Sequence, residues 1–453
     1  MVNTDSLGKD KILPLMLKMA IPTMLAQIVN LFYNIVDKIY IGHIKDIGGD
    51  ALTGVGLTSA LILIISAFSS FISNGGAPLA SIELGKKNHQ KAEKILGNGF
   101  TFLTIISLIL MIVFYCFQDF YFNLVGGSTV TTPYGKDYLN IYLIGTIFVM
   151  ISLGLNNFLT VQGKSTIAML SIVIGAIFNI ILDPLFIFVF HLGVKGAALA
   201  TVISQGISAI WIIYMLTRKN MTLKLKLVNL KLDKNIMKGV LCLGISPFVM
   251  AITESLITLT LSGQLKKYGD DNYVGSLTIL QSVMQLMSTP LTGFTQGVTP
   301  LMSYNYGAKN NDRLKEIVKY LFIFLFIYTL TFALSTMIFP SFYASIFTDK
   351  KEIIAIVKIY LPTFMAGMTI FGIQRACQTT FIATGQAKIS LFIALLRKVI
   401  LLIPLAFILP LLLKVQGVYV SEAIADATAA IICGIIFIFL FPRILKKNII
   451  EVE

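Results

Sequence analysis

Long apolar segments alternate with short polar ones along the whole chain. A helix needs about 20 predominantly apolar residues to cross about 30 Å of hydrocarbon. Windows of this kind fall at residues 15–41, 51–75, 96–118, 138–159, 167–190, 196–217, 239–262, 274–298, 317–341, 357–381, 390–413 and 416–441. The pattern predicts an all-α polytopic membrane protein with twelve transmembrane helices.

The two halves of the chain repeat each other. A Leu-Gly-Lys-Lys loop at Gly85 precedes Gln-Gly-Lys at Gly163, and a Tyr-Gly-Ala-Lys loop at Gly307 precedes Thr-Gly-Gln at Gly385. Both pairs of glycines are 78 residues apart. The repeat predicts two pseudo-symmetric six-helix bundles, residues 1–217 and 239–453, joined by a linker at 218–238. Such repeats are typical of transporters whose path lies between the halves.

Composition and charge support this interpretation. Of the 453 residues, 56% are hydrophobic and only 13% are charged, against about a quarter charged in soluble domains. Of the 36 Lys and Arg, 23 lie at the termini, in the linker or in the loops that follow even-numbered spans, and only eight lie in the other loops. By the positive-inside rule, both termini are expected to be cytoplasmic and the protein to lie in the plasma membrane. The net charge of +14 therefore reflects topology, and no nucleic-acid partner is expected.

The linker is the most basic segment of the chain. It holds seven basic residues and one acid, Asp233, and its stretch of alternating Leu and Lys is compatible with an amphipathic strand or with a helix at the lipid headgroups. We favour a solvated cytoplasmic loop that connects the halves.

Carboxylates inside the first half indicate where the chemistry lies. A carboxylate near the middle of a span costs at least about 2.5 kcal/mol, so it requires a partner, a water-filled cavity or a proton. Asp37 follows Tyr33 by one helical turn, Asn179 and Asp183 are four residues apart, and Thr201 begins the next span. These oxygens suit Na⁺, held by Asp37, Asn179, Asp183 and Thr201, or a proton shared between the carboxylates. We therefore predict a cation-coupling site.

The alternative is purely structural. Asp183 would cap the end of a span near the outer surface, and Asp37 would pair with Lys38 or with headgroups. The matching Tyr and Asn turns favour the functional interpretation for the group. Counted from the paired prolines and glycines, the second-half counterparts of the two aspartates are Ser262 and Leu405. We therefore expect the cation to enter only the first half.

The second half has its own set of charges within or near its spans. They are Glu254, Arg375, Arg397, Glu422 and Asp426. We expect Arg397 to form a structural ion pair with Glu422 or Asp426. Glu254 is expected to contact substrate or to pair with Arg375. The candidate substrate-binding residues are Asn30, Asn156, Glu254 and Gln374.

These features resemble the multidrug and toxic compound extrusion (MATE) family over essentially the whole chain. The matching segments are Tyr33-Asn-Ile-Val-Asp37, Asn179-Ile-Ile-Leu-Asp-Pro184 and the run from Gly193 to Thr201. The resemblance implies a V-shaped fold and export of amphipathic, often cationic drugs, including antibiotics, in exchange for inward Na⁺ or H⁺. It looks closest to members whose cation site is in the N-terminal lobe, and there Tyr33, Asp37, Asn179, Asp183 and Thr201 match the cation-holding residues.

The expected partners and oligomeric state agree with this resemblance. We expect a monomer without a cofactor, with small-molecule substrates and membrane lipids as its partners. Members that couple through the C-terminal lobe place a Glu in span 7 and an Asp in span 10, whereas span 10 here has Gln374 and Gln378. This departure argues against a cation site in the second half.

Three other functions fit the sequence less well. A lipid-linked oligosaccharide flippase of the same superfamily would share the architecture, but its cavity should be rich in Arg and Lys for pyrophosphate. An enzyme would need a nucleophile with a base or a His-rich metal set, and the chain has only three His. A receptor or scaffold would not need a matched repeat. The choice between Na⁺ and H⁺ stays open, with the neutral oxygens slightly favouring Na⁺.

Overall fold

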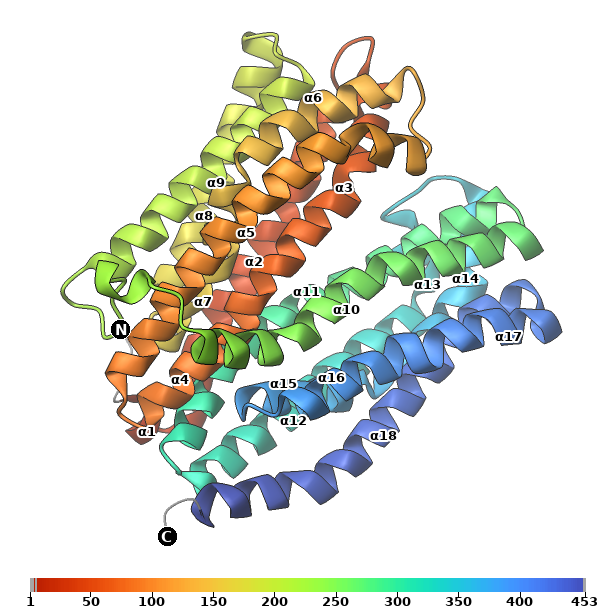
Figure 1. Cartoon of the computed structure of the whole chain (residues 1–453). Coiled ribbons are helices and arrows are strands. Elements are labelled where there is room, and N and C mark those ends of the chain that lie inside the picture. The colour runs from red at the N-terminus through yellow and green to blue at the C-terminus, as the bar shows by residue number, and fades with distance from the viewer. Residues whose placement is uncertain (1–3, 5, 451–453) are drawn as a thin grey trace.

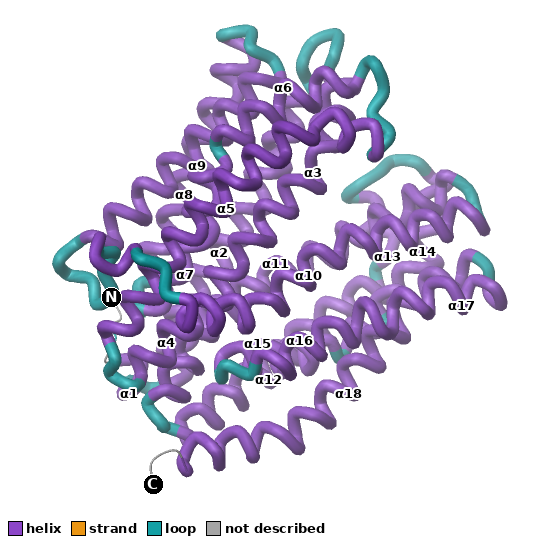
Figure 2. Tube along the Cα trace, viewed as in Figure 1, coloured by secondary structure: helices purple, strands orange, loops and turns teal. Residues whose placement is uncertain are grey.

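The chain forms two helical bundles side by side (Figure 1). The computed structural model describes residue 4 and residues 6–450, and within that range it contains helices and loops but no strand (Figure 2). After a single-turn helix α1 (Ser6–Lys9), the first bundle comprises α2 (Ile12–Gly42), α3 (Gly48–Ser70), α4 (Ala77–Gly85), α5 (His89–Leu124), α6 (Thr131–Ile144), α7 (Thr146–Val161), α8 (Ser165–Pro184) and α9 (Val194–Thr217). The second comprises α10 (Lys234–Tyr268), α11 (Asp271–Gly307), α12 (Asn311–Ile338), α13 (Pro340–Ser345), α14 (Lys351–Met365), α15 (Phe371–Ala383), α16 (Ala387–Leu395), α17 (Ile403–Leu413) and α18 (Val415–Ile450).

Five short turns of other helical types interrupt or connect these elements. They are the π-helical η1 (Phe71–Gly76), η2 (Leu185–Val189) and η5 (Leu396–Leu402), and the 3₁₀-helical η3 (Leu227–Leu230) and η4 (Gly367–Thr369). Turns of the π type frequently occur at functional sites. η2 directly follows Pro184, whose missing N–H cannot complete an α-helical hydrogen bond. In η5 the adjacent residues Arg397 and Lys398 both lie in the bundle interior, 6% and 4% exposed.

The helices form the twelve predicted spans. By length and composition, eight described segments can cross a membrane, or nine if α6 and α7, bent by 59°, count as one span. One of these segments, Ala387–Asn448, contains two spans, α16–α17 and α18. The units α11 and α14–α15 complete the set. α11 is less apolar because it places Gln281, Gln285 and Gln296 on cavity walls. The two-bundle, twelve-helix fold is thus confirmed.

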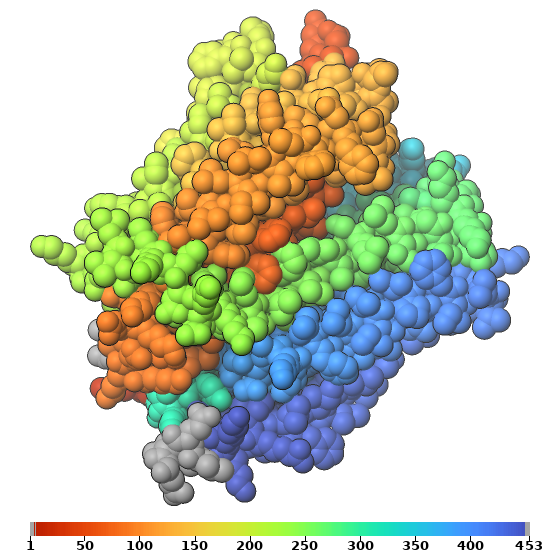
Figure 3. Space-filling view, in the orientation of Figure 1, coloured from red at the N-terminus to blue at the C-terminus, as the bar shows by residue number. Residues whose placement is uncertain are grey.

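The bundles meet at one end and separate at the other. α11 packs closely against α2 and α4, and α10 packs against η1. A Cβ atom added at Gly307 would lie 2.0 Å from the Ile82 carbonyl oxygen, and one at Gly85 would lie 2.1 Å from that of Tyr304. The bundles touch near α1 and α4 and diverge toward α6 and α14 (Figure 1). Figure 3 shows the resulting groove between the orange and the green surfaces.

This contact leads to a first prediction. Gly307→Ala should force α4 and α11 apart, because the new methyl group would overlap a backbone carbonyl, and overpacking of this kind costs about 1–3 kcal/mol. We expect a lower melting temperature and a longer distance between spin labels at Lys87 and Lys309. Gly263→Ala is the control, because its Cβ meets nothing within 4 Å. Equal behaviour of the two variants would show that this contact does not hold the bundles together.

The linker is packed more tightly than a solvated loop. Glu93 of α5 pairs with Lys226 at 2.6 Å, and the Asn98 amide donates to the Lys231 carbonyl at 3.1 Å. Leu223 is fully buried against the first bundle. The expectation of a solvated loop therefore holds only in part. Leu227 and Val228 are 86% and 89% exposed, whereas polar side chains of α5 bind the linker backbone near Asn229 and Lys231.

Candidate functional site

Helices α2, α8 and α9 bring together all five residues of the predicted cation site. α2 packs along α8, and the carboxyl groups of Asp37 and Asp183 are neighbours close enough to interact electrostatically. The Asn179 amide donates to Asp183 Oδ1 at 3.3 Å and to Thr201 Oγ1 at 3.5 Å. Tyr33 projects from α2 one turn before Asp37. The i, i+4 spacing on α2 and on α8 thus aligns two polar faces across one helix contact.

Several oxygens of this site lack a hydrogen-bond partner. Asp37 Oδ1, Asn179 Oδ1, Asp183 Oδ2 and Ser204 Oγ are buried without one. Asp183 is fully buried and Asn179 is 1% exposed. Buried polar atoms in proteins are nearly always hydrogen-bonded, so a cluster of partnerless oxygens requires an explanation. A cation with oxygen ligands, or a proton on one carboxyl group, would satisfy them.

A small cavity of about 50 Å³ adjoins the site. Its lining includes Asn30, Tyr33, Asn179, Thr201, Ser204 and Gln205. Asn30, predicted to contact substrate, therefore lies beside the cation site, in a space too small for a drug molecule. Gln205 donates to the Tyr33 hydroxyl at 3.4 Å. Sequence analysis missed Ser204 and Gln205, although they follow Thr201 by one helical turn and share its face.

Asn156 lies on a second cavity of about 210 Å³ at the junction of the bundles. Its amide nitrogen donates to Ser171 Oγ at 2.6 Å and to the Ala168 carbonyl at 3.0 Å. On the same cavity, Gln27 of α2 donates to Gln296 of α11 at 2.9 Å, which connects the bundles. The donors of Asn156 are thus engaged within its own bundle.

The central cavity lies between the bundles and has a volume of about 350 Å³. Cavities of this size accommodate drug-sized molecules. Its walls include Ser73, Asn74 and Asn157 of the first bundle and Met250, Glu254, Thr292, Arg375, Gln378 and Lys398 of the second. Glu254 is thus placed where a substrate contact was predicted. Gln374 is 1% exposed and does not line this cavity, whereas the next residue, Arg375, does.

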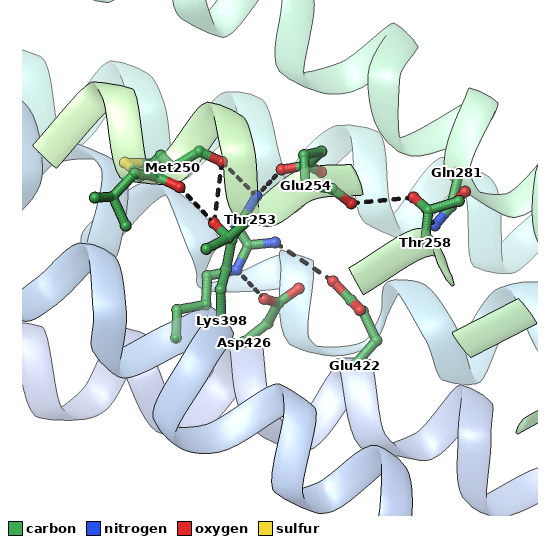
Figure 4. Close-up of polar contacts among 10 residues, drawn as sticks. Met250, Thr253, Glu254, Thr258, Gln281, Lys398, Glu422 and Asp426 are labelled. Atoms are coloured by element: carbon green, nitrogen blue, oxygen red, sulfur yellow. Dashed lines mark hydrogen bonds and ion pairs between the residues drawn. The ribbon is translucent and has the colours of Figure 1, made fainter. Parts of the chain in front are cut away.

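Arg397 and Lys398 of the second bundle form ion pairs with acids. Arg397 donates to Asp426 Oδ1 at 2.5 Å and to Glu422 Oε1 at 3.4 Å. The predicted ion pair with Glu422 or Asp426 is thus formed with both acids. Glu254 pairs with Lys398, not with Arg375. The expected Glu254–Arg375 pair is therefore absent, because η5 places Lys398 in the interior opposite α10. Figure 4 shows Lys398 in contact with Met250 and Glu254, and below them Glu422 and Asp426, which belong to α18.

Comparison with known proteins agrees with this architecture. The chain is 27% identical over 441 residues to the multidrug export protein MepA of Staphylococcus haemolyticus, covering 97% of this chain and 96% of the relative. It is 25% identical over 436 residues to MepA of Staphylococcus aureus, covering 96% of each. Its fold is similar to that of a MATE transporter crystallised in a bent conformation, with a TM-score of 0.92, 22% identity and 99% of each chain covered.

An outward-facing structure of a multidrug resistance MATE transporter is similar as well, with a TM-score of 0.91, 21% identity and coverage of 98% of this chain and 99% of the other. The MatE family matches residues 22–185 and 248–408, one segment in each bundle. That match spans most of both bundles, including Asp37 and Asp183. The chain therefore belongs to the MATE family of membrane transporters, which is not a family of enzymes.

Proposed function

We propose that this protein exports amphipathic, often cationic compounds in exchange for a cation, Na⁺ or H⁺, that enters through the first bundle. The observation that carries the proposal is the cluster of buried, partnerless oxygens around Asp37 and Asp183 beside drug-sized space between the bundles. The multidrug export function of the MepA relatives, aligned over nearly the whole chain, supports it. On the wall of the central cavity, Glu254 and the amides of Asn74 and Asn157 are groups that suit a cationic part of a substrate.

Helix α2 is the element that can couple the two events. It carries Asp37 toward one end, Gln27 on the junction cavity in its middle and Pro22 within the stretch that packs against α11. Proline removes a backbone hydrogen bond and makes a helix easier to bend there. Cation binding at Asp37 would bend α2 near Pro22, or reorient α8 at the Pro184 break, and reshape the cavity. The second bundle would act as the rigid partner.

The positive-inside pattern supports a cytoplasmic location for both termini. The end where the bundles touch carries the basic loops at Gly85 and Gly307, so the groove would open to the outside of the plasma membrane. In this proposal the two functional halves are residues 1–217 and 239–453, and residues 218–238 are the cytoplasmic linker between them. The protein would act as a monomer among membrane lipids, because a single chain contains all the residues of the proposed cation site and of the cavity between the bundles.

Transport into inside-out vesicles tests the export function. We expect energised vesicles containing the protein to accumulate ethidium, and vesicles without it to accumulate none. Release of a labelled lipid-linked sugar across the bilayer, without ethidium uptake, would instead identify a flippase and contradict the proposal. Vesicles carrying the Asp37→Asn variant provide the matched background.

A further prediction separates substrate range from coupling. Glu254→Gln removes the acid that pairs with Lys398 on the cavity wall but leaves the first bundle unchanged. We expect the ratios of the transport rates of different cationic dyes to change by about tenfold, which corresponds to about 1.4 kcal/mol. Transport of every dye should still depend on the ion gradient. Rates measured for a panel of dyes with and without the gradient will check this. Loss of ion dependence for all dyes would place the coupling site in the second bundle.

A further inference from the structure

The second bundle has a cavity of its own that opens into the central one. Its volume is about 460 Å³. It shares Met250, Glu254, Thr292, Arg375 and Lys398 with the central cavity, so the two are continuous. The rest of its wall consists mainly of α11 side chains, most of them polar, together with Phe371, Arg397 and, from the first bundle, Gln27. A substrate in the central cavity can therefore extend into the second bundle.

The charges on this wall are unbalanced. Glu254, Arg375, Arg397 and Lys398 line the cavity, which gives three cations for one acid. Arg397 is neutralised from behind by Asp426 and Glu422 and also lies over the Phe371 ring at 4.7 Å. Lys398 is neutralised by Glu254, whose side chain is 51% exposed. One cationic group remains without an acid.

That group is Arg375, on α15. Within the described part of the chain, no carboxylate forms an ion pair with it, and its hydrogen bonds go to the hydroxyls of Thr292 at 3.2 Å and Thr295 at 3.4 Å. Its Nε is buried and has no partner. An unpaired charge within a span is costly and is usually retained for function. Guanidinium groups bind carboxylates with particularly favourable geometry.

We propose that Arg375 is an anion-binding residue of the transport cavity and takes the carboxylate of amphipathic substrates that carry both charges. The carboxylate would accept from the Arg375 guanidinium, and Lys398 would supply a second donor when Glu254 turns toward the cationic end of the substrate. This proposal rests on the export function proposed above and assigns the residue that recognises the negative charge of a substrate. Glu254 suits the cationic end of such a substrate, and Arg375 suits its carboxylate.

Direct binding to the purified full-length protein tests this proposal without any ion gradient, so it can fail while the export function stands. The two probes are a rhodamine with a free carboxylate and the methyl ester of the same dye, measured by fluorescence anisotropy. We expect Arg375→Gln to weaken binding of the carboxylate dye about tenfold, which corresponds to about 1.4 kcal/mol. The ester should change by no more than about twofold, because it has no negative charge.

Two further variants complete the test. Arg375→Lys keeps the charge and should retain most of the affinity for the carboxylate dye. Arg443→Gln removes an exposed arginine outside both cavities and should change neither dye. Unimpaired ester binding by Arg375→Gln shows that the variant is folded. The proposal is overturned if the wild-type protein does not bind the carboxylate dye, or if Arg375→Gln affects both dyes equally or neither.

Discussion

Asp37→Asn and Asp183→Asn are each expected to reduce ion-driven ethidium export to the background of vesicles without the protein. The amide keeps the shape of the side chain but can neither exchange a proton nor neutralise a bound cation. The two carboxyl groups are neighbours in one buried site, so loss of either should disable it. Export is measured in proteoliposomes, and the melting temperature of each variant checks folding. Asp312→Asn, on an aspartate that is 97% exposed, is the control and should export normally.

Near-normal export by both aspartate variants would contradict the proposed site. A different failure is also informative. If Glu254→Gln abolished ion-driven transport of every substrate while Asp37→Asn did not, the roles of the two bundles would be reversed.

Arg397→Met is expected to cause the largest loss of stability. It removes the partner of two acids that are almost fully buried, Glu422 at 2% and Asp426 at 0% exposed. Breaking a buried ion pair by removing one partner costs about 3–5 kcal/mol, because the remaining charge is left uncompensated. We expect a melting temperature well below that of the wild-type protein, measured by thermal unfolding in detergent.

A second substitution distinguishes lost charge balance from lost packing. Adding Glu422→Gln and Asp426→Asn to Arg397→Met removes the stranded charges and should recover much of the stability. A single variant as stable as the wild-type protein, or a triple variant no better than the single one, would show that the ion pairs do not brace the second bundle.

The fold follows from the sequence to a large extent, because apolar windows and the internal repeat are properties of the chain itself. α11, which the window 274–298 predicted, is less apolar than most of the other spans. Its three glutamines reduce its apolar character because one of its faces lines cavities and does not contact lipid. The cluster proposed as a cation site could also be predicted from the sequence, since Tyr33 with Asp37 and Asn179 with Asp183 follow regular helical spacing.

The second bundle was less predictable because its local geometry departs from the α-helix. A regular α-helix would direct Arg397 and Lys398 about 100° apart, whereas the π turn η5 buries both. Lys398 thereby becomes the partner of Glu254, and Arg375 is left for the cavity. No periodicity rule identifies a π turn in advance, so the partner of Glu254 was assigned incorrectly. Gln374 and Arg375 illustrate a similar difficulty. They are adjacent on one helix, yet Gln374 is buried away from the central cavity and Arg375 lines it.

Drug efflux from de-energised proteoliposomes under imposed gradients tests the central claim most directly. A Na⁺ gradient is imposed at equal pH, and then a pH gradient without Na⁺, for the wild-type protein and for Asp37→Asn. We predict that the wild-type protein drives ethidium efflux with a cation gradient, Na⁺ in preference to H⁺, and that Asp37→Asn responds to neither. Drive by the pH gradient alone would overturn the preference for Na⁺. Efflux that responds to neither gradient in the wild-type protein, or that persists in Asp37→Asn, would contradict cation-coupled export through the first bundle.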